Sequence, residues 1–215
     1  MQDLTLVIPA KHESESLPIF LKEISLFSCK KIIVLDKNDF KTIHAIKDFN
    51  KIDVLYQQQK GYGAALIEGI NSVKTNYFCI INADGSMNPS YLSDMLKILK
   101  NNNLDYLFAS RYEKPGGGSD DDNFITTIGN FIFSNIGNLF FSLKISDILF
   151  TYVIGKKDSF KSLKINSKDF TFCVEFPIKA KRQKSKYLTM PSFERSRIGG
   201  KKKVNAFKDG LLILI

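Results

Sequence analysis

The chain has 215 residues, of which 44% are hydrophobic and 25% are charged. These proportions are typical of a soluble fold of one domain and exclude a wholly disordered or collagen-like chain. The three cysteines form no CxxC pair and only two histidines occur, so no zinc site is expected and the thiols should be reduced. The sequence has no run of about 18 apolar residues, and the apolar start at residues 4–8 lacks the basic lead of a secretory signal.

The net charge of +9 is concentrated in one part of the chain. Residues 156–208 contain sixteen Lys or Arg and four Asp or Glu, whereas the remainder is slightly acidic. Such a segment favours an anionic partner (a phosphate, a nucleic acid or a lipid headgroup), and a lysine-rich solvated surface is the alternative. Nucleic acid is disfavoured, because no aromatic side chains alternate with the cations of residues 195–203 to stack on bases.

Short β-rich runs alternate with helical patterns through the first half of the chain. The predicted strands are residues 4–8, 32–35, 53–56, 77–81 and 106–109, and the predicted helices are residues 17–27, 42–49, 64–73 and 91–101. Strands separated by helices of this length predict an α/β fold with a mostly parallel sheet flanked by helices. Ligands bind at the carboxyl ends of the strands in such sheets, so the residues that follow each strand form the candidate site.

Two features mark the second half of the sequence. Residues 113–122 contain Pro115, three glycines and three aspartates, which predicts a mobile loop. Residues 124–149 are rich in Phe, Ile and Leu on all sides of a helical axis, which predicts a long helix or helix pair, either deeply buried or in contact with lipid. This segment and the basic region could sit together on anionic lipid; helices packed onto the sheet beside a solvated basic face are an equal alternative.

Asp84 is the sharpest local feature, because it stands just beyond the predicted strand 77–81 and before Gly85, which allows a tight turn. A carboxylate there can hold Mg²⁺ or Mn²⁺, whose remaining ligands are substrate phosphates and waters. The cation would neutralise charge on a departing diphosphate. The alternative is that Asp84 only caps the turn before the helix near Pro89.

Gly61 and Gly63 resemble the start of a dinucleotide-binding fingerprint, with Asp84 near the place of an acidic ribose ligand. A Rossmann-type NAD(P)-binding oxidoreductase is therefore an alternative function, although Leu66 replaces the third glycine of that pattern. The glycines fit better a loop that approaches a neighbour closely before a helix begins, where Lys60 could meet a phosphate.

Asp36 and the basic stretch 195–203 complete the candidates. Asp36 follows the strand 32–35 and suits a hydrogen bond to a base or ribose, or else caps the next helix. Residues 195–203 set five cations around two glycines. Flexible backbone with clustered Arg and Lys is suited to gripping phosphate.

In chain order these segments resemble the motifs of the family 2 glycosyltransferases of GT-A fold, particularly the dolichyl- and polyprenyl-phosphate sugar transferases. The resemblance covers nearly the whole chain, and it is specific because seven short motifs occur in the right order. The matching segments are residues 7–18, 32–36, 60–69, 82–89, Ser110-Arg111-Tyr112, Ser146-Asp147 with Thr151-Tyr152, and Arg197-Ile198-Gly199-Gly200-Lys201.

The resemblance implies a UDP- or GDP-sugar donor, a Mg²⁺ or Mn²⁺ ion, and a lipid-phosphate or glycan acceptor. The donor-binding residues that it implies are Pro9, Lys11, Glu13, Asp36, Lys60, Gly63, Asn82 and Asp84. The implied metal ligands are Asp84 and Ser86. The implied contacts to donor or acceptor phosphates are Arg111, Arg195, Arg197 and Lys201. Arg111 and Asp147 would be catalytic, with Asp147 as the base toward a hydroxyl acceptor.

The reaction that the resemblance implies is inverting sugar transfer by a single in-line displacement. A phosphate acceptor needs no strong base, because its oxygen is already an anionic nucleophile, and catalysis is then mainly positioning and electrostatics. Some positions depart from the family motifs: Asn82 replaces the first aspartate of the metal motif, and Lys37 replaces an acidic residue. An inactive nucleotide-binding module of the same fold is therefore a further alternative.

We expect one GT-A domain over residues 1–215. Its nucleotide-sugar-binding half is residues 1–112, its acceptor- and membrane-facing half is residues 123–215, and the loop 113–122 joins them. The protein is expected in the cytoplasm, with peripheral contact at the cytoplasmic membrane face and no nucleic-acid partner.

Overall fold

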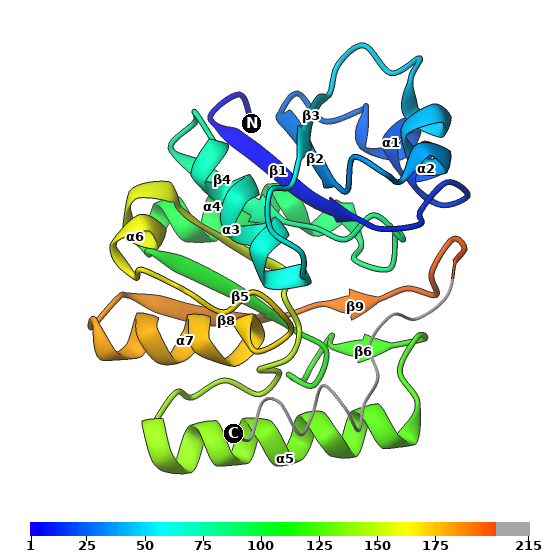
Figure 1. Cartoon of the computed structure of the whole chain (residues 1–215). Helices are drawn as coiled ribbons and strands as arrows, with labels where there is room; N and C mark the ends of the chain where they lie inside the picture. Colours follow the sequence, from blue (N-terminus) through cyan, green and yellow to red (C-terminus); the bar gives the residue numbers. More distant parts are fainter. Residues whose placement is uncertain (201–215) are drawn as a thin grey trace.

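The computed structural model describes residues 1–200, which form a seven-stranded sheet with helices on both faces (Figure 1). The strands of this sheet are β1 (Leu4–Ala10), β2 (Lys30–Leu35), β3 (Asp53–Tyr56), β4 (Tyr77–Ile80), β5 (Tyr106–Ser110), β7 (Val153–Lys156) and β8 (Tyr187–Pro191). A separate pair joins β6 (Gly118–Ser119) to β9 (Phe193–Glu194). The helices are α1 (Leu17–Ile24), α2 (Phe40–Ile46), α3 (Tyr62–Ser72), α4 (Leu92–Asn101), α5 (Phe124–Phe141), α6 (Lys157–Ser162) and α7 (Phe172–Arg182), with a 3₁₀ turn η1 (Pro89–Tyr91).

The strand order is β3-β2-β1-β4-β7-β5-β8. Six of these strands run parallel, and β7 alone runs antiparallel, between β4 and β5. The predicted α/β fold with a mostly parallel sheet is therefore confirmed. All five predicted strands and all four helices of the first half are present, with ends that differ by a few residues.

Both faces of the sheet carry a hydrophobic core, as a parallel sheet requires. On one face α1 and α4 cover the strands with side chains such as Phe20 and Met95. On the other face α3, α6 and α7 cover them, and phenylalanines dominate. Phe176 packs edge-on against Tyr106 and Phe160, at centroid distances of 5.0 and 5.3 Å. Five of the 18 phenylalanines of the chain are therefore buried in this second core.

The predicted helix or helix pair at 124–149 ends sooner than expected. α5 stops at Phe141, and Ser142 follows in the left-handed conformation at a φ of 52°. The apolar residues beyond it belong to a loop that fills the second core, and Leu143, Ile145 and Ile148 are all buried there. The apolar run therefore reflected two different environments, which the sequence pattern alone did not separate.

The segment 113–122, predicted to be a mobile loop, contains β6 and makes specific contacts. The Gly117 N–H donates to the Glu113 carbonyl at 2.9 Å, and the Asp120 N–H donates to the Glu194 carbonyl at 3.0 Å. Asp122 pairs with Arg111 just before the segment, and Asp121 pairs with the distant Arg197, which composition could not reveal. The two predicted halves also share one sheet, because β7 and β8 lie within it.

Candidate active site

The C-terminal ends of the parallel strands meet at one edge of the sheet, as predicted. Ala10 at the end of β1 pairs with Leu35 at the end of β2, and Val7 pairs with Ile80 at the end of β4. The loops that follow these ends carry most of the predicted site residues. The sheet topology therefore brings the segments after β1, β2 and β4 together, although they lie far apart in sequence.

Asp84 lies in a tight turn after β4. Its Oδ1 accepts a hydrogen bond from the Ser86 N–H at 3.1 Å, and Gly85 turns the chain at a φ of 75°. Nearby, Asn82 Oδ1 accepts a hydrogen bond at 3.1 Å from the hydroxyl of Tyr62 at the start of α3. Burial raises the pKa of Tyr62, and the Asp84 charge also contributes to this rise. Asn82 and Asp84 thus lie near the same phenol.

The oxygen atoms of this turn fit a divalent cation bound together with a substrate. Asn82 and Asp84 supply an amide oxygen and a carboxylate, the hard donors that Mg²⁺ and Mn²⁺ prefer. Within residues 1–200 no group of three or more His, Cys, Asp or Glu side chains is placed to hold a metal ion. A cation here would therefore take its other ligands from substrate phosphates and water. Ser86 is fully buried beside Asp84.

Residues 194–200, which we call the C-terminal strap, lie across the Asp84 turn. The Ile198 N–H donates to the Asp84 carbonyl at 2.8 Å, and the Arg195 N–H donates to the Ser86 carbonyl at 2.9 Å. The Ile198 side chain covers Gly85 so closely that a Cβ there would lie 2.4 Å from it. The strap therefore forms one wall of the candidate site.

The two arginines of the C-terminal strap are already paired with carboxylates. Arg195 binds both oxygens of Glu23, at 2.8 and 3.1 Å. Arg197 binds both oxygens of Asp121, at 3.0 and 2.6 Å, and lies 3.8 Å from Asp84 Oδ2. The hydrogen bonds to Asp121 raise the pKa of Arg197. Of the predicted phosphate ligands, Lys201 lies outside the described residues.

Arg111, after β5, is buried among carboxylates instead of facing open space. Its Nε donates to Asp147 Oδ2 at 2.7 Å and its Nη2 donates to Asp147 Oδ1 at 2.8 Å. Its Nη1 lies 3.0 Å from both Glu194 and Asp122. The guanidinium carbon also lies 4.5 Å from the centre of the Phe150 ring.

This cluster pairs the two predicted catalytic residues, Arg111 and Asp147, with each other. Burial acts to lower the pKa of Arg111, but Asp147 and the other carboxylates outweigh it and raise that pKa well above its ordinary value. Three carboxylates surround the guanidinium, so Arg111 is already paired and is not free to bind a phosphate. Both oxygens of Asp147 accept hydrogen bonds from Arg111, so the carboxylate is engaged within the cluster. Sequence motifs gave the two residues without their partners.

Glu13 and Asp39 join the loops after β1 and β2. The Glu13 carboxylate accepts a 2.5 Å hydrogen bond from the Ser16 hydroxyl, and the Glu13 backbone N–H donates to Thr42 Oγ1 at 3.0 Å. Asp39 caps α2 and accepts a 2.7 Å hydrogen bond from the His12 N–H. Burial acts to raise the pKa of Asp39, but hydrogen bonds from His12 and Thr42 outweigh it, so that pKa is lowered.

The remaining donor-side residues lie closer to solvent. Pro9 is half-buried at the end of β1, Lys11 and Lys60 are exposed, and Asp36 is half-buried. The Asp36 carboxylate accepts a hydrogen bond from the Asn38 N–H at 2.9 Å. These residues therefore leave polar groups accessible beside the ends of β1 and β2, where a base or ribose could bind.

Gly61 and Gly63 serve packing within the chain. A Cβ at Gly63 would lie 2.3 Å from the Ser167 carbonyl oxygen, and one at Gly61 would lie 2.0 Å from that of Lys168. The predicted close approach is therefore present, and its partner is the segment before α7 and not a phosphate. This removes the observation on which the dinucleotide alternative depended.

Sequence reasoning missed four residues that shape the site. Tyr62 stands between Gly61 and Gly63 at the start of α3. An aromatic residue at that position could have been recognised in the sequence as a candidate site residue. Asp39 stands three residues before Thr42 in a standard capping position. Glu194 is the lone acid in a basic stretch, and Asp122 was counted only as loop charge. The pairing of the last two with Arg111 had no local signal.

The mostly parallel sheet with the antiparallel β7 within it and polar residues at its strand ends is an α/β fold of the GT-A type. The family model described as "Glycosyl transferase family 2" matches residues 5–164. The chain therefore belongs to glycosyl transferase family 2.

Curated relatives and solved structures agree with this assignment. Uncharacterised glycosyltransferases of Mycobacterium bovis and Mycobacterium tuberculosis are 29% identical over 93 residues, which are 43% of this chain. The match spans 42% of the length of those relatives. Glucosyl-3-phosphoglycerate synthase from M. tuberculosis, solved with Mn²⁺, UDP and phosphoglyceric acid, superposes with a TM-score of 0.72 at 11% identity, covering 98% of this chain and 75% of its own. A structure described as a mycobacterial protein gives a TM-score of 0.75 at 10% identity, with coverage of 98% and 72%.

Proposed function

We propose that the protein is an inverting glycosyltransferase that moves a sugar from a UDP- or GDP-sugar to a phosphate-bearing acceptor. The observation that carries this proposal is the Asp84 turn, with the Asn82 amide, at the edge of the sheet where the polar strand ends converge. Glucosyl-3-phosphoglycerate synthase, which shares the fold, has been solved with UDP and with Mn²⁺ or Mg²⁺. That likeness supports a nucleotide donor and a divalent cation.

The proposed donor-binding residues divide between the nucleoside and the diphosphate with its cation. Pro9, Glu13 and Asp36, at the ends of β1 and β2, hold the base and the ribose. Asn82 and Asp84 hold Mg²⁺ or Mn²⁺, with Ser86 supporting the Asp84 turn. When bound there, the cation withdraws charge from the departing nucleoside diphosphate.

The buried Arg111 cluster favours a phosphate over a hydroxyl as the nucleophile. The family aspartate at the acceptor side, Asp147, has both oxygens bonded to Arg111. A hydroxyl acceptor needs a base to take its proton, whereas a phosphate oxygen attacks as an anion. A single displacement by that oxygen inverts the anomeric carbon. A polyprenyl or dolichyl phosphate is the acceptor that we propose, and a glycan precursor is the second candidate.

Calorimetry with UDP- and GDP-sugars, with and without Mn²⁺, tests the donor and the metal. We expect Mn²⁺-dependent binding of one nucleotide class, loss of that dependence in Asp84→Asn, and tighter Mn²⁺ binding in Asn82→Asp. Asp94→Asn, an exposed aspartate in the first turn of α4, is the matched control and should match the unaltered protein. Failure of every nucleotide to bind, with or without Mn²⁺, would defeat the proposal.

An inactive nucleotide-binding module is the second candidate function. The reason is Asn82, because an amide holds a cation more weakly than a carboxylate does. Release of nucleoside diphosphate, measured with polyprenyl phosphate, phosphoglycerate or a glycan as acceptor, distinguishes the two. Nucleotide binding without release in every arm would favour the inactive module. Release with phosphoglycerate alone would refute the lipid acceptor.

A further inference from the structure

α5 buries polar or small side chains and exposes large apolar ones, which is the reverse of the usual pattern in helices of soluble domains. Its buried residues are polar or small, namely Asn130, Ser134 and Gly137. Its exposed residues are large and apolar: Phe124, Ile125, Ile128, Phe131, Ile132, Leu139 and Phe140, with exposures from 42% to 80%. No charged residue occurs in the helix. Exposed apolar patches of this kind mark surfaces that contact a protein or a membrane.

The helix is long and apolar enough to cross a membrane by length and composition, and 17% of it is buried. Its hydrogen bonds, however, hold it along the side of the domain. Ser134 Oγ accepts from the Ile148 N–H at 3.1 Å and Asn130 Oδ1 accepts from the Leu149 N–H at 3.0 Å. A helix fixed in this way meets a bilayer from one side, parallel to its surface.

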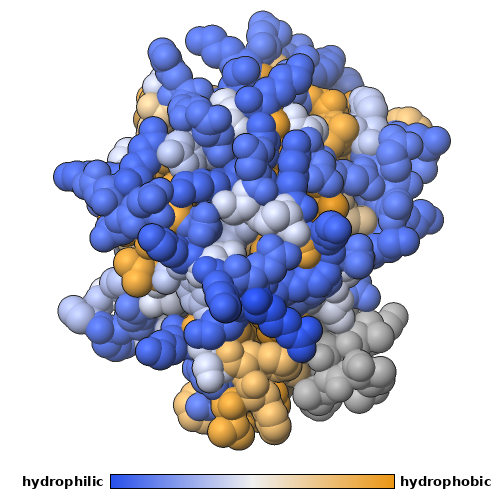
Figure 2. Space-filling view, turned by 90° about the vertical axis from the view of Figure 1, so that its left-hand side faces the viewer, coloured by the Kyte–Doolittle hydropathy of each residue, from blue (hydrophilic) through white to orange (hydrophobic). Residues whose placement is uncertain are grey.

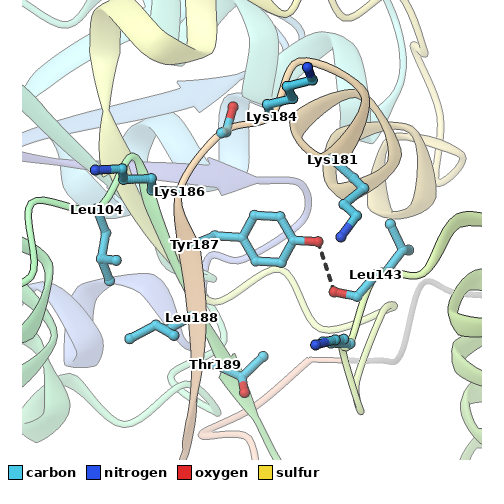
Figure 3. Close-up of a pocket in the computed structure, with 10 residues that line it drawn as sticks. Leu104, Leu143, Lys181, Lys184, Lys186, Tyr187, Leu188 and Thr189 are labelled. Carbon is cyan, nitrogen blue, oxygen red and sulfur yellow. Dashed lines mark hydrogen bonds between the residues drawn. The ribbon is translucent and has the colours of Figure 1, made fainter.

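A cluster of lysines lies beyond the C-terminal end of α5. Lys144, Lys181, Lys184 and Lys186 line a pocket of about 570 Å³, and the Tyr187 hydroxyl donates to the Leu143 carbonyl at 2.7 Å within it (Figure 3). We call this the lysine pocket. None of its lysines forms an ion pair with a carboxylate of residues 1–200. Their positive charge is therefore not neutralised by the described part of the protein.

The apolar face and the lysine pocket are neighbours on the molecule. Leu143 and Lys144 follow α5 directly, and α7, which ends beside Lys184, packs against α5. Figure 2 shows an apolar patch at the base of the molecule, on the side where Figure 1 places the C-terminal end of α5, with hydrophilic residues directly above it. Apolar surface bordered by cations matches the two layers of an anionic leaflet, acyl chains and phosphate headgroups.

We propose that α5 and the lysine pocket form a platform that docks the protein on an anionic phospholipid leaflet. The exposed residues of α5 enter the acyl-chain boundary, and the lysines bind headgroup phosphates. The exposed face has no charged group to fix a register with a protein partner, whereas a leaflet requires none. This inference concerns α5 and the pocket alone, so it stands or falls independently of sugar transfer.

Vesicle co-sedimentation of the full chain tests the platform. We expect binding to vesicles of phosphatidylglycerol and phosphatidylcholine at about 50 mM salt, and weaker binding at about 500 mM salt, because salt screens the lysines. Pure phosphatidylcholine should bind much less. Ile128→Gln with Phe131→Gln, and Lys184→Glu with Lys186→Glu, should each weaken partitioning by about tenfold or more.

Matched controls lie elsewhere on the surface. Phe40→Gln removes an apolar side chain that is 72% exposed at the start of α2, and Lys51→Glu with Lys74→Glu reverses two exposed charges. Both should bind vesicles like the unaltered chain, and circular dichroism confirms that every variant is folded. A protein that stays in the supernatant with anionic vesicles at low salt overturns the proposal. So does a lipid-free dimer that Ile128→Gln with Phe131→Gln converts to a monomer, because a second copy then covers the face.

Discussion

Arg111 illustrates how the partners of one side chain decide its chemistry. The triplet Ser110-Arg111-Tyr112 predicts a cation at the end of a strand, and the structure places one there. The carboxylates that surround it come from distant segments, Asp147 from the loop before β7 and Glu194 from β9. Such pairings depend on tertiary structure, so a motif can supply the residue but not its electrostatic environment.

The structure predicts that Asp147 stabilises the fold. Asp147→Ala leaves the buried Nε and Nη2 of Arg111 without acceptors, and each such loss costs about 1–3 kcal/mol. We expect the free energy of unfolding to fall by about 3 kcal/mol, measured by urea denaturation. Asp158→Ala, whose side chain is 89% exposed, should change it by less than about 0.5 kcal/mol. Equal stability of the two variants would contradict the burial of the Arg111 cluster.

At the scale of elements, the sequence predicted what depends on local periodicity. The strand and helix ranges of the first half needed only alternating β-rich and helical runs, and the structure has them. The end of α5 at Phe141 was missed, because the apolar residues that follow continue the same composition in a buried loop. β7 was missed as well, since Val153–Lys156 is short and joins the sheet between strands far away in sequence.

Two glycines in different helices should respond oppositely to alanine. At Gly63, in the first turn of α3, the new Cβ would meet two backbone carbonyls at 2.3 and 2.7 Å. Backbone cannot move aside cheaply, so Gly63→Ala should destabilise by about 2 kcal/mol or more. At Gly129, inside α5, no atom lies within 4 Å, so Gly129→Ala should stabilise by about 0.5–1 kcal/mol. Thermal unfolding of both variants checks the signs, and a shift in the same direction would contradict this packing.

At the scale of the whole molecule, Asp39 makes stability depend on pH. The folded state lowers the pKa of this carboxyl, so its ionised form favours folding. That contribution is complete above the ordinary pKa of about 4 and is lost as the pH falls through the lower folded value. Asn can still cap the helix but carries no charge, so Asp39→Asn should be less stable by about 1 kcal/mol at neutral pH through the loss of charge at the start of α2. The difference should shrink below about pH 4.

Urea denaturation across a pH series measures this difference. The exposed Asp48 offers a control in the same region, and Asp48→Asn should follow the unaltered protein at every pH. A gap between Asp39→Asn and the unaltered protein that stays constant down to about pH 2 would show that the carboxylate charge is not what the fold uses.

The site as a whole was predictable in its position and less so in its internal contacts. A parallel sheet brings strand ends together whatever their side chains are, so the edge that carries Asp36 and Asp84 followed from the order of elements. The C-terminal strap over the Asp84 turn did not. The sequence predicted Arg195 and Arg197 as phosphate ligands. In the structure they form ion pairs with Glu23 and Asp121, which are distant in sequence.

The place of β7 constrains how the chain can acquire its structure as it is synthesised. β4 and β5 are made early and run in the same direction, but each pairs with β7 and not with the other. Until residues 153–156 have left the ribosome, both strands present unpaired edges, which are templates for aggregation. In a nascent chain stalled before that point, β4 and β5 are not yet joined through β7. Binding of chaperones to the nascent chain should therefore be strongest there and should fall once β7 has emerged.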